Sequence, residues 1–296
     1  MNTKREHWVT SGDLTLYAVA EGHPTATPLV LVHGYPDNHH VWDKVADKLR
    51  GQFLVIRYDV RGAGRSDKPP RTKDYQLNQL AKDLESVVNA IIPEQAFHLA
   101  AHDWGSVQSW ESVTDPQLQT RILSYTSISG PCLDHVGFWI RNQILSPNTG
   151  GTSKVLRQLI SSWYIALFQV PVLPELAWKA GLDRLWPNYL KTKEQVHDAR
   201  FSTFQKSDGL HGIKLYRANF LPRLLRPRAR RTHCPVQVII PTRDAYVGAQ
   251  LTDEAVRWTG KLTLQKLDAP HWAVLTMPDA ICQLVSTFIA ANDRRS

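Results

Sequence analysis

The sequence predicts an α/β fold with a mostly parallel sheet, helices on both faces and one long helical insertion. In the first third, short apolar runs alternate with helical patterns, which is typical of parallel strands joined by helices. From about residue 131 to 231 the chain is rich in Trp, Tyr, Leu and Pro and has no clear strand signal, whereas strand signals return afterwards. We therefore predict a core in two parts, residues 1–131 and 232–296, separated by a helical cap of residues 132–231.

Each predicted strand is a short run with apolar residues either continuous or alternating. In chain order, the predicted strands are 14–22, 28–34, 53–59, 97–103, 121–129, 235–241 and 261–268. Apolar residues at helical spacing predict helices over about 41–49, about 80–92, directly after 103 and over about 278–291. Because active sites of such sheets lie at the carboxyl ends of the strands, the insertion is expected to cover the site as a lid.

The composition is typical of a globular protein without a membrane span. The 296 residues carry a net charge of +8, and the densest basic run, residues 222–233, has no interleaved aromatic residues and no helical amphipathic pattern. We interpret this run as a solvated connector broken by proline, with a nucleic-acid or membrane patch as the alternative. No apolar stretch is long enough to cross a bilayer, and three widely spaced cysteines indicate buried thiols in a reducing, cytoplasmic compartment.

The segment HLAAHDWGSV, residues 98–107, has the pattern of a nucleophile elbow in α/β-hydrolases. In that pattern a strand turns sharply into a helix, and small residues flank the nucleophile on either side. Ala101 and Gly105 meet this need, although glycine is more usual at the first position. Asp103 then occupies the exposed tip of the turn, near the positive end of the following helix. Taken alone, Asp103 is also compatible with a helix-capping residue.

Further candidate residues follow three other strands, in the chain order that a hydrolase triad requires. Asp244 follows the strand at 235–241, and His271 follows the strand at 261–268. The sequence HGYP after residue 32 corresponds to the loop that supplies one oxyanion-hole N–H group, and the residue after the nucleophile supplies the other. We predict the triad Asp103, Asp244 and His271, with the N–H groups of Tyr35 and Trp104 as donors. The residues expected to support the site or its pocket are His33, Gly34, Pro36, His102 and Trp272.

These motifs resemble the α/β-hydrolases that use an aspartate nucleophile, namely epoxide hydrolases and haloalkane dehalogenases. The segment HDWGS fits both groups, and HGYP resembles the H-G-x-P motif of epoxide hydrolases. In the insertion, YIALFQVP at residues 164–171 and LYRAN at 215–219 resemble the two epoxide hydrolase cap motifs. Segments SISGPCLDH and ALFQVPVL resemble bacterial epoxide hydrolase domains that occur fused ahead of a short-chain dehydrogenase, although no Gly-rich dinucleotide motif follows His271.

The resemblance implies an epoxide hydrolase with Tyr164 and Tyr216 as the ring-opening tyrosines. It implies attack by Asp103 on an epoxide carbon, an ester intermediate and its hydrolysis by water activated by His271. It also implies no metal and no organic cofactor, an apolar small-molecule epoxide as substrate, no nucleic-acid partner, and a monomer or homodimer. The alternatives are a haloalkane dehalogenase with the same triad, for which a second halide donor is not evident, and a non-enzymatic binding protein on the same scaffold.

Overall fold

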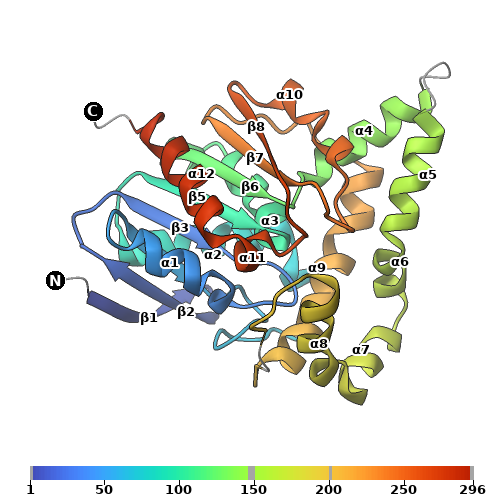
Figure 1. Ribbon diagram of the computed structural model, residues 1–296, viewed down its shortest axis with the longest axis horizontal. Helices are drawn as coiled ribbons and strands as arrows, with labels where there is room; N and C mark the ends of the chain where they lie inside the picture. Colours follow the sequence, from blue (N-terminus) through green and yellow to red (C-terminus); the bar gives the residue numbers. More distant parts are fainter. Residues whose placement is uncertain (1–2, 146–150, 200–201, 294–296) are drawn as a thin grey trace.

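The computed structural model describes residues 3–145, 151–199 and 202–293, and these form an eight-stranded sheet covered by helices (Figure 1). The strand order is β1-β2-β4-β3-β5-β6-β7-β8. β2 pairs antiparallel with β1 and β4, and all other neighbours pair parallel, which confirms the predicted α/β class and mostly parallel sheet. The strands are β1 (Thr3–Ser11), β2 (Leu14–Gly22), β3 (Pro28–Val32), β4 (Leu54–Tyr58), β5 (Phe97–His102), β6 (Ile122–Ile128), β7 (Val236–Pro241) and β8 (Leu262–Leu267).

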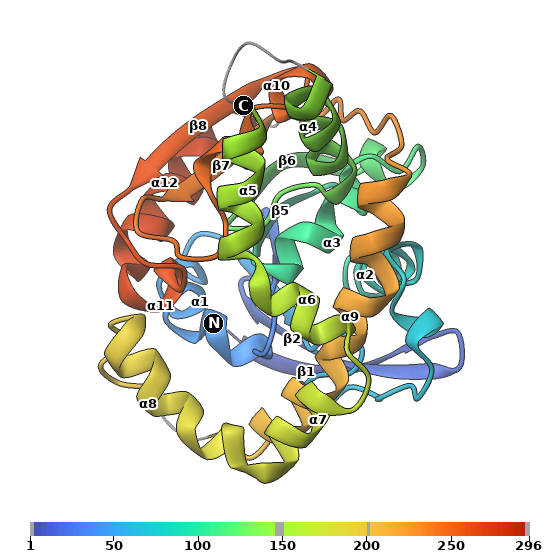
Figure 2. The same cartoon turned by 90° about the vertical axis from the view of Figure 1, so that its right-hand side faces the viewer.

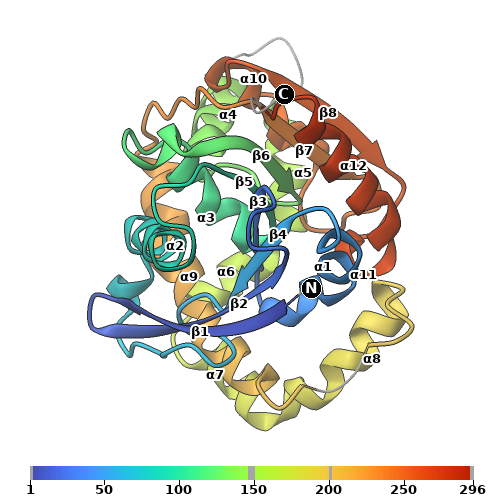
Figure 3. The ribbon, with the colours of Figure 1, turned by 90° about the vertical axis from the view of Figure 1, so that its left-hand side faces the viewer.

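Helices flank both faces of this sheet (Figure 3). They are α1 (Asp43–Leu49), α2 (Leu77–Ile91), α3 (Trp104–Val113), α10 (Ala255–Trp258), α11 (Ala273–Thr276) and α12 (Pro278–Ala290). Alternate residues of a strand point to opposite faces, so Val30 packs in the same cluster as Leu84 of α2, whereas Leu29 packs with Val45 of α1 and Val285 of α12. The result is two apolar cores, one on each side of the sheet.

The helical insertion, defined here as residues 132–231, lies between β6 and β7 and extends from one end of the sheet (Figures 1 and 2). Its helices are α4 (Leu133–Leu145), α5 (Gly151–Ser161), α6 (Trp163–Gln169), α7 (Leu173–Ala177), α8 (Asp183–Lys193) and α9 (Gln205–Leu225). Short 3₁₀ turns occupy His39–Trp42, Thr72–Tyr75, Leu118–Thr120 and Ala249–Thr252, and a π-helical turn occupies Trp178–Leu182. No helix among the described residues combines the length and the apolar character needed to cross a membrane.

The basic run at 222–233 differs from the predicted solvated connector. Its first residues are the last turn of α9, and two of its arginines bind buried acids of the core and of α4. Arg228 donates to Glu111 at 2.6 Å and to Asp134 at 2.9 Å, and Arg230 pairs with Glu111 at 3.0 Å. Because both acids are almost fully buried, these arginines neutralise charges that would otherwise be costly to bury, and they fix the end of the insertion to the core.

Candidate active site

Asp103 forms the turn between β5 and α3 with a backbone conformation that side chains rarely adopt. Its φ is 53° and its ψ is −124°, a strained geometry of the kind that clusters at functional sites. The turn tolerates no side chain at Gly105, where a Cβ atom would lie 2.2 Å from the carbonyl oxygen of Val32. The methyl group of Ala101, the one departure from the usual pattern, is fully buried in the core. The turn therefore has the geometry predicted for the segment.

The loop after β3 contacts the carboxylate of Asp103 directly. The N–H group of Tyr35 donates a hydrogen bond of 2.7 Å to Asp103 Oδ1. This approach depends on Gly34, because a Cβ atom there would lie 2.3 Å from the same oxygen. For the second predicted donor, Trp104, no hydrogen bond to the carboxylate is found within the described ranges; its N–H belongs to the first residue of α3, directly after Asp103.

His271 lies between the two predicted acids. Its Nδ1 is 2.9 Å from Asp244 Oδ2, and its Nε2 is 3.4 Å from Asp103 Oδ2. The other oxygen of Asp244 accepts the N–H groups of Tyr246 and Val247 at 2.8 and 3.0 Å, which fixes the carboxylate. Burial alone would lower the pKa of His271, but the two carboxylates outweigh it and hold the pKa well above its usual value. The imidazole therefore favours its protonated form while both acids are charged.

Two further predicted residues brace the loops of the site rather than line its cavity. His33 Nε2 accepts the N–H group of Val60 at 2.9 Å, and its Nδ1 lies 2.8 Å from the carbonyl oxygen of Gly34. Burial lowers the pKa of His33 to about 4, and that of His102 to about 4 as well, so both rings are neutral at pH 7. His102 Nε2 lies 2.9 Å from the carbonyl oxygen of His271 and holds that loop.

The remaining two predicted support residues link the loop after β3 to other parts of the fold. The indole of Trp272 donates a hydrogen bond of 2.8 Å to Asp37 and so ties the His271 loop to the loop after β3. The carbonyl oxygen of Pro36 accepts a hydrogen bond of 2.8 Å from Gln205 of α9. Both contacts help to hold the loop after β3 in place.

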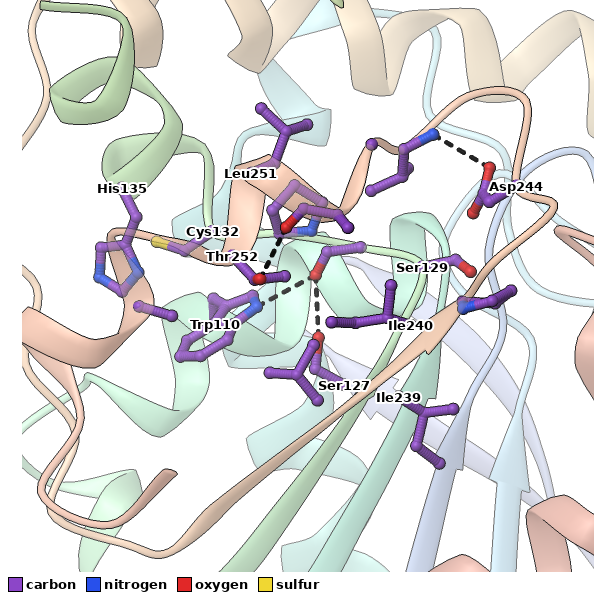
Figure 4. A pocket seen from close by; sticks show the side chains of 18 residues that line it. Trp110, Ser127, Ser129, Cys132, His135, Ile239, Ile240, Asp244, Leu251 and Thr252 are labelled. Carbon is purple, nitrogen blue, oxygen red and sulfur yellow. Dashed lines mark hydrogen bonds between the residues drawn. The ribbon is translucent and has the colours of Figure 1, made fainter. Parts of the chain in front are cut away.

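The turn after β6 supports the elbow from below. Gly130 lies against Asp103, since a Cβ atom at this glycine would be 2.3 Å from the Asp103 carbonyl oxygen. The carbonyl oxygen of Gly130 accepts hydrogen bonds from Ser106, Ser127 and Trp110 at 2.7, 3.1 and 3.1 Å. Figure 4 shows the latter two bonds beside a cavity of about 20 Å³, which Asp244 borders on its other side. This polar network fixes the backbone under Asp103.

A larger cavity of about 430 Å³ opens above Asp103, between the sheet and the insertion. Tyr164 of α6 and Tyr216 of α9 both line it, and their rings are 6.0 Å apart and nearly perpendicular. Burial, together with the negative charge of Asp103, raises the pKa of both phenols above the ordinary value, so both stay protonated. The rest of the lining is mostly apolar, including Val107, Leu133, Val136, Ile140, Ile165, Phe220, Leu221, Leu224 and Leu251.

Two residues of the site were missed by sequence reasoning. The ring of Tyr246 contacts His271 at 4.9 Å and Tyr164 at 5.5 Å, and so forms the wall between the triad and the cavity. Its position two residues after the predicted acid was the available signal. Arg217 donates to the carbonyl oxygens of Phe168 and Val170, both at 2.7 Å, and thereby holds the end of α6 against α9. It follows Tyr216 within the LYRAN segment, so the motif contained this residue without revealing its role.

The described side chains do not form a metal-binding cluster. Over the ranges that the structure describes, no three His, Cys, Asp or Glu side chains gather in a way that could hold a metal ion. The three cysteines are buried free thiols, and burial raises the pKa of Cys132 to about 12. The polar residues that line the cavity are Asp103, Tyr164, Tyr216, Tyr246, Ser129, Ser162, Gln158 and Gln169.

Comparison with known proteins agrees with this architecture. A family model described as the alpha/beta hydrolase fold matches residues 27–278. The "Probable oxidoreductase EphD" of Mycobacterium tuberculosis is 32% identical over 92% of this chain and 47% of its own length, so the chain spans about half of that relative. "Epoxide hydrolase 3" of Xenopus tropicalis is 28% identical over 93% of this chain and 75% of its own.

Solved structures show the same fold. The epoxide hydrolase of Bacillus megaterium in complex with an inhibitor aligns over 96% of this chain and all of its own, with a TM-score of 0.80 at 19% identity. Together with the match of the family model over most of the sequence, this establishes that the chain belongs to the α/β-hydrolase fold family.

Proposed function

We propose that this protein is an epoxide hydrolase that converts an apolar epoxide and water to a vicinal diol through an ester on Asp103. One observation carries the proposal: an aspartate at the nucleophile position and two protonated tyrosines line the same apolar cavity. The names of relatives such as Epoxide hydrolase 3 of Xenopus tropicalis and Epoxide hydrolase 4 of Homo sapiens support it. No metal or organic cofactor is required by the steps below.

In the first step, a carboxylate oxygen of Asp103 attacks one carbon of the epoxide ring. The carbon–oxygen bond of the ring breaks, and the new bond joins the substrate to Asp103 as an ester. The ring oxygen, which gains negative charge, takes a proton from the hydroxyl group of Tyr164 or Tyr216 while the other tyrosine donates a hydrogen bond. The raised pKa of both phenols keeps these protons available at neutral pH.

In the second step, His271 first gives the proton that it holds in the resting site to the tyrosinate, which restores the phenol. Water then attacks the ester carbonyl of Asp103 and passes a proton to Nε2 of the neutral imidazole. Ester formation has removed the negative charge of Asp103, which was one of the two charges that held the proton on the imidazole, so His271 releases this proton more readily and becomes available as a base at this stage. The developing oxyanion is stabilised by the Tyr35 N–H group, already 2.7 Å from Oδ1, and by the Trp104 N–H group. The ester bond then breaks, and the departing alkoxide takes the proton that remains on the oxygen from water, which gives the diol. The site is thereby restored with the carboxylate of Asp103 and a protonated His271.

The electrophile, an sp³ carbon of the epoxide, explains why the nucleophile would be an aspartate rather than a serine. Serine would attack an alkyl carbon to form an ether, which the site has no means to hydrolyse. With aspartate the intermediate is an ester whose carbonyl group belongs to the enzyme, so the same N–H groups that hold the resting carboxylate serve the hydrolysis step.

The insertion completes the proposed site, because residues 132–231 supply both tyrosines and most of the apolar cavity wall. We assign it the role of a cap and the two flanking segments, 1–131 and 232–296, the role of a catalytic core. The cavity lining favours an aromatic or long-chain aliphatic epoxide over a small polar one.

The proposal is tested by trapping the ester. Replacement of His271 by Gln removes the base but leaves Asp103 intact, so incubation with styrene oxide is expected to increase the intact mass by one substrate. Peptide mapping is expected to place the adduct on Asp103. The matched control, His271→Gln with Asp103→Asn, should stay unmodified. If His271→Gln stays unmodified across a panel of aryl and fatty epoxides, the ester mechanism is wrong, and halide release from haloalkanes would instead favour a dehalogenase.

A further inference from the structure

The outer surface of the helical insertion is unusually apolar. Of the 16 large apolar side chains exposed among the described residues, 13 belong to the insertion, although it is only about a third of the chain. They are between 44% and 78% exposed. These residues are Ile144, Leu145, Leu156, Leu159, Ile160, Trp163, Val170, Val172, Leu173, Leu176, Leu185, Leu221 and Leu225. Such a concentration on one segment marks an interaction surface rather than scattered surface residues.

Helix α5 forms the centre of this surface, with its apolar face turned outward. Leu156, Leu159 and Ile160 lie on one face of α5 at i, i+3 and i+4 spacing, and Trp163, the first residue of α6, follows at i+7; each is at least 56% exposed. The buried face of α5 includes a glutamine, Gln158. Figures 1 and 2 show α5, α6 and α7 as the layer of the insertion farthest from the sheet. The helix therefore presents its more apolar side to the surroundings of the protein.

The same segment carries the positive charge of the protein. The insertion has 16 Lys and Arg residues but six Asp and Glu residues, so its net charge exceeds that of the whole chain. Four of the six acids are buried, and the other two are paired with basic residues. Glu175 is paired with Arg217, Asp198 is paired with Lys44 at 2.7 Å, and the other four, Asp134, Asp183, Glu194 and Asp208, are at most 6% exposed. By contrast, Lys154 and Arg157 on α5 are exposed beside its apolar face.

The cavity above Asp103 reaches this surface. Leu159 of α5 and Leu221 of α9 are 56% and 51% exposed, yet both also line the cavity. The apolar lining of the cavity is therefore continuous with the apolar outer surface, and no charged side chain is among the residues that line the cavity apart from Asp103.

We propose that the outer face of the insertion, centred on Leu156, Ile160 and Trp163, docks on an anionic lipid bilayer. An exposed apolar helix face flanked by Lys and Arg is the arrangement with which amphipathic helices lie in the interface of negatively charged membranes, and Trp is enriched at that depth. A second copy of the chain fits less well, because a symmetric contact would bring two strongly basic surfaces together. In this position the mouth of the cavity faces the acyl chains, so a lipid-dissolved substrate enters without crossing water; this last point rests on the proposed function.

Vesicle co-sedimentation of the full chain tests the docking without any epoxide. We expect binding to vesicles of phosphatidylcholine with one third phosphatidylglycerol, much weaker binding to pure phosphatidylcholine, and loss of binding in high salt, which screens the charges. The double variant Leu156→Gln, Ile160→Gln is expected to lose about tenfold or more in vesicle affinity, because two large side chains can no longer be buried in the interface. These residues do not line the cavity, and glutamine retains helix propensity.

The control is Val256→Gln with Leu264→Gln, which removes two exposed apolar side chains outside the insertion and should bind vesicles as the unmodified protein does. Equal binding by the α5 variant and the unmodified protein would refute the proposed face, and failure of the unmodified protein to bind anionic vesicles would refute the docking whatever the variants do. A dimer of the unmodified protein that becomes a monomer in the α5 variant would assign the face to a second copy instead. Vesicle binding is measured without an epoxide, so failure of the ester-trapping experiment would not change the binding results. The epoxide hydrolase proposal and the membrane-docking proposal can therefore be refuted independently.

Discussion

Replacement of Gly34 by alanine probes the contact on which both chemical steps depend. The added Cβ atom would lie 2.3 Å from Asp103 Oδ1, 2.6 Å from Asp103 Cβ and 2.7 Å from the backbone nitrogen of Trp104. A Cβ atom in a folded protein essentially never lies closer than 3.0 Å to another heavy atom, so the loop must move by at least about 0.7 Å or the carboxylate must rotate. Either movement breaks the 2.7 Å hydrogen bond from the Tyr35 N–H group.

The size of the effect follows from the role of that donor. Loss of one oxyanion-hole N–H typically slows acyl chemistry by about 10²–10³-fold, which corresponds to about 3–4 kcal/mol of transition-state stabilisation. Overpacking costs a further ~1–3 kcal/mol of folding stability. We therefore expect Gly34→Ala to fold with a lowered Tm, to form the ester and to hydrolyse it about 10²–10³ times more slowly, so that the ester accumulates.

The assay is a single-turnover experiment in which the ester is followed by intact mass and the diol by chromatography. Gly51→Ala is the matched control, because the same methyl group there meets no atom within 4 Å and should leave both rates unchanged. If folded Gly34→Ala hydrolysed its ester within about threefold of the unmodified rate, an effect below 1 kcal/mol, the assignment of Tyr35 as an oxyanion donor would be wrong.

Three further predictions concern the protons of the site. Tyr164→Phe and Tyr216→Phe should each slow ester formation much more than ester hydrolysis, measured as separate phases in stopped-flow; equal slowing of both phases would contradict the acid role. The raised pKa of His271 should stabilise the folded protein at pH values below the pKa of an unfolded histidine, and this contribution should disappear as the pH rises through the folded pKa. Urea unfolding at several pH values should therefore show that the stability advantage of the unmodified protein over His271→Gln shrinks as the pH rises, and a constant or growing advantage would refute the raised pKa. In Asp103→Asn, which removes one of the two negative charges, an NMR titration should find a lower pKa for His271 than in the unmodified protein.

The predicted strands agree with the structure because a buried parallel strand needs apolar side chains on both faces, which the sequence displays as short apolar runs. β1 was not predicted, because its sequence has no such apolar run. Its residues Lys4, Arg5 and Glu6 are exposed, and as an edge strand it pairs with β2 alone. The tight turn at Gly12, with a φ of 58°, was the available signal for this hairpin.

The insertion was predicted to be helical, but its individual helices and the shape of its cavity were not. Sequence periodicity marks an apolar helix face without telling whether that face is buried. The most regular apolar stripe, which runs from Leu156 of α5 to Trp163 at the start of α6, is exposed, whereas Gln158 of α5 is buried. The positions of Tyr164 and Tyr216 in one cavity depend on contacts such as Arg217 with Phe168, which join segments about 50 residues apart and leave no periodic signal.

The charge on Asp103 couples the two halves of the proposed reaction. While Asp103 is ionised, its Oδ2 atom is 3.4 Å from Nε2 of His271 and helps to hold the proton on the imidazole. The imidazole is therefore protonated in the resting site and cannot act as a base there. Ester formation neutralises Asp103, so the imidazole then keeps the charged contact with Asp244 at 2.9 Å but loses the one with Asp103. The site therefore gains its base only after the intermediate exists, which explains why a buried histidine can lie between two carboxylates without activating water before the ester has formed.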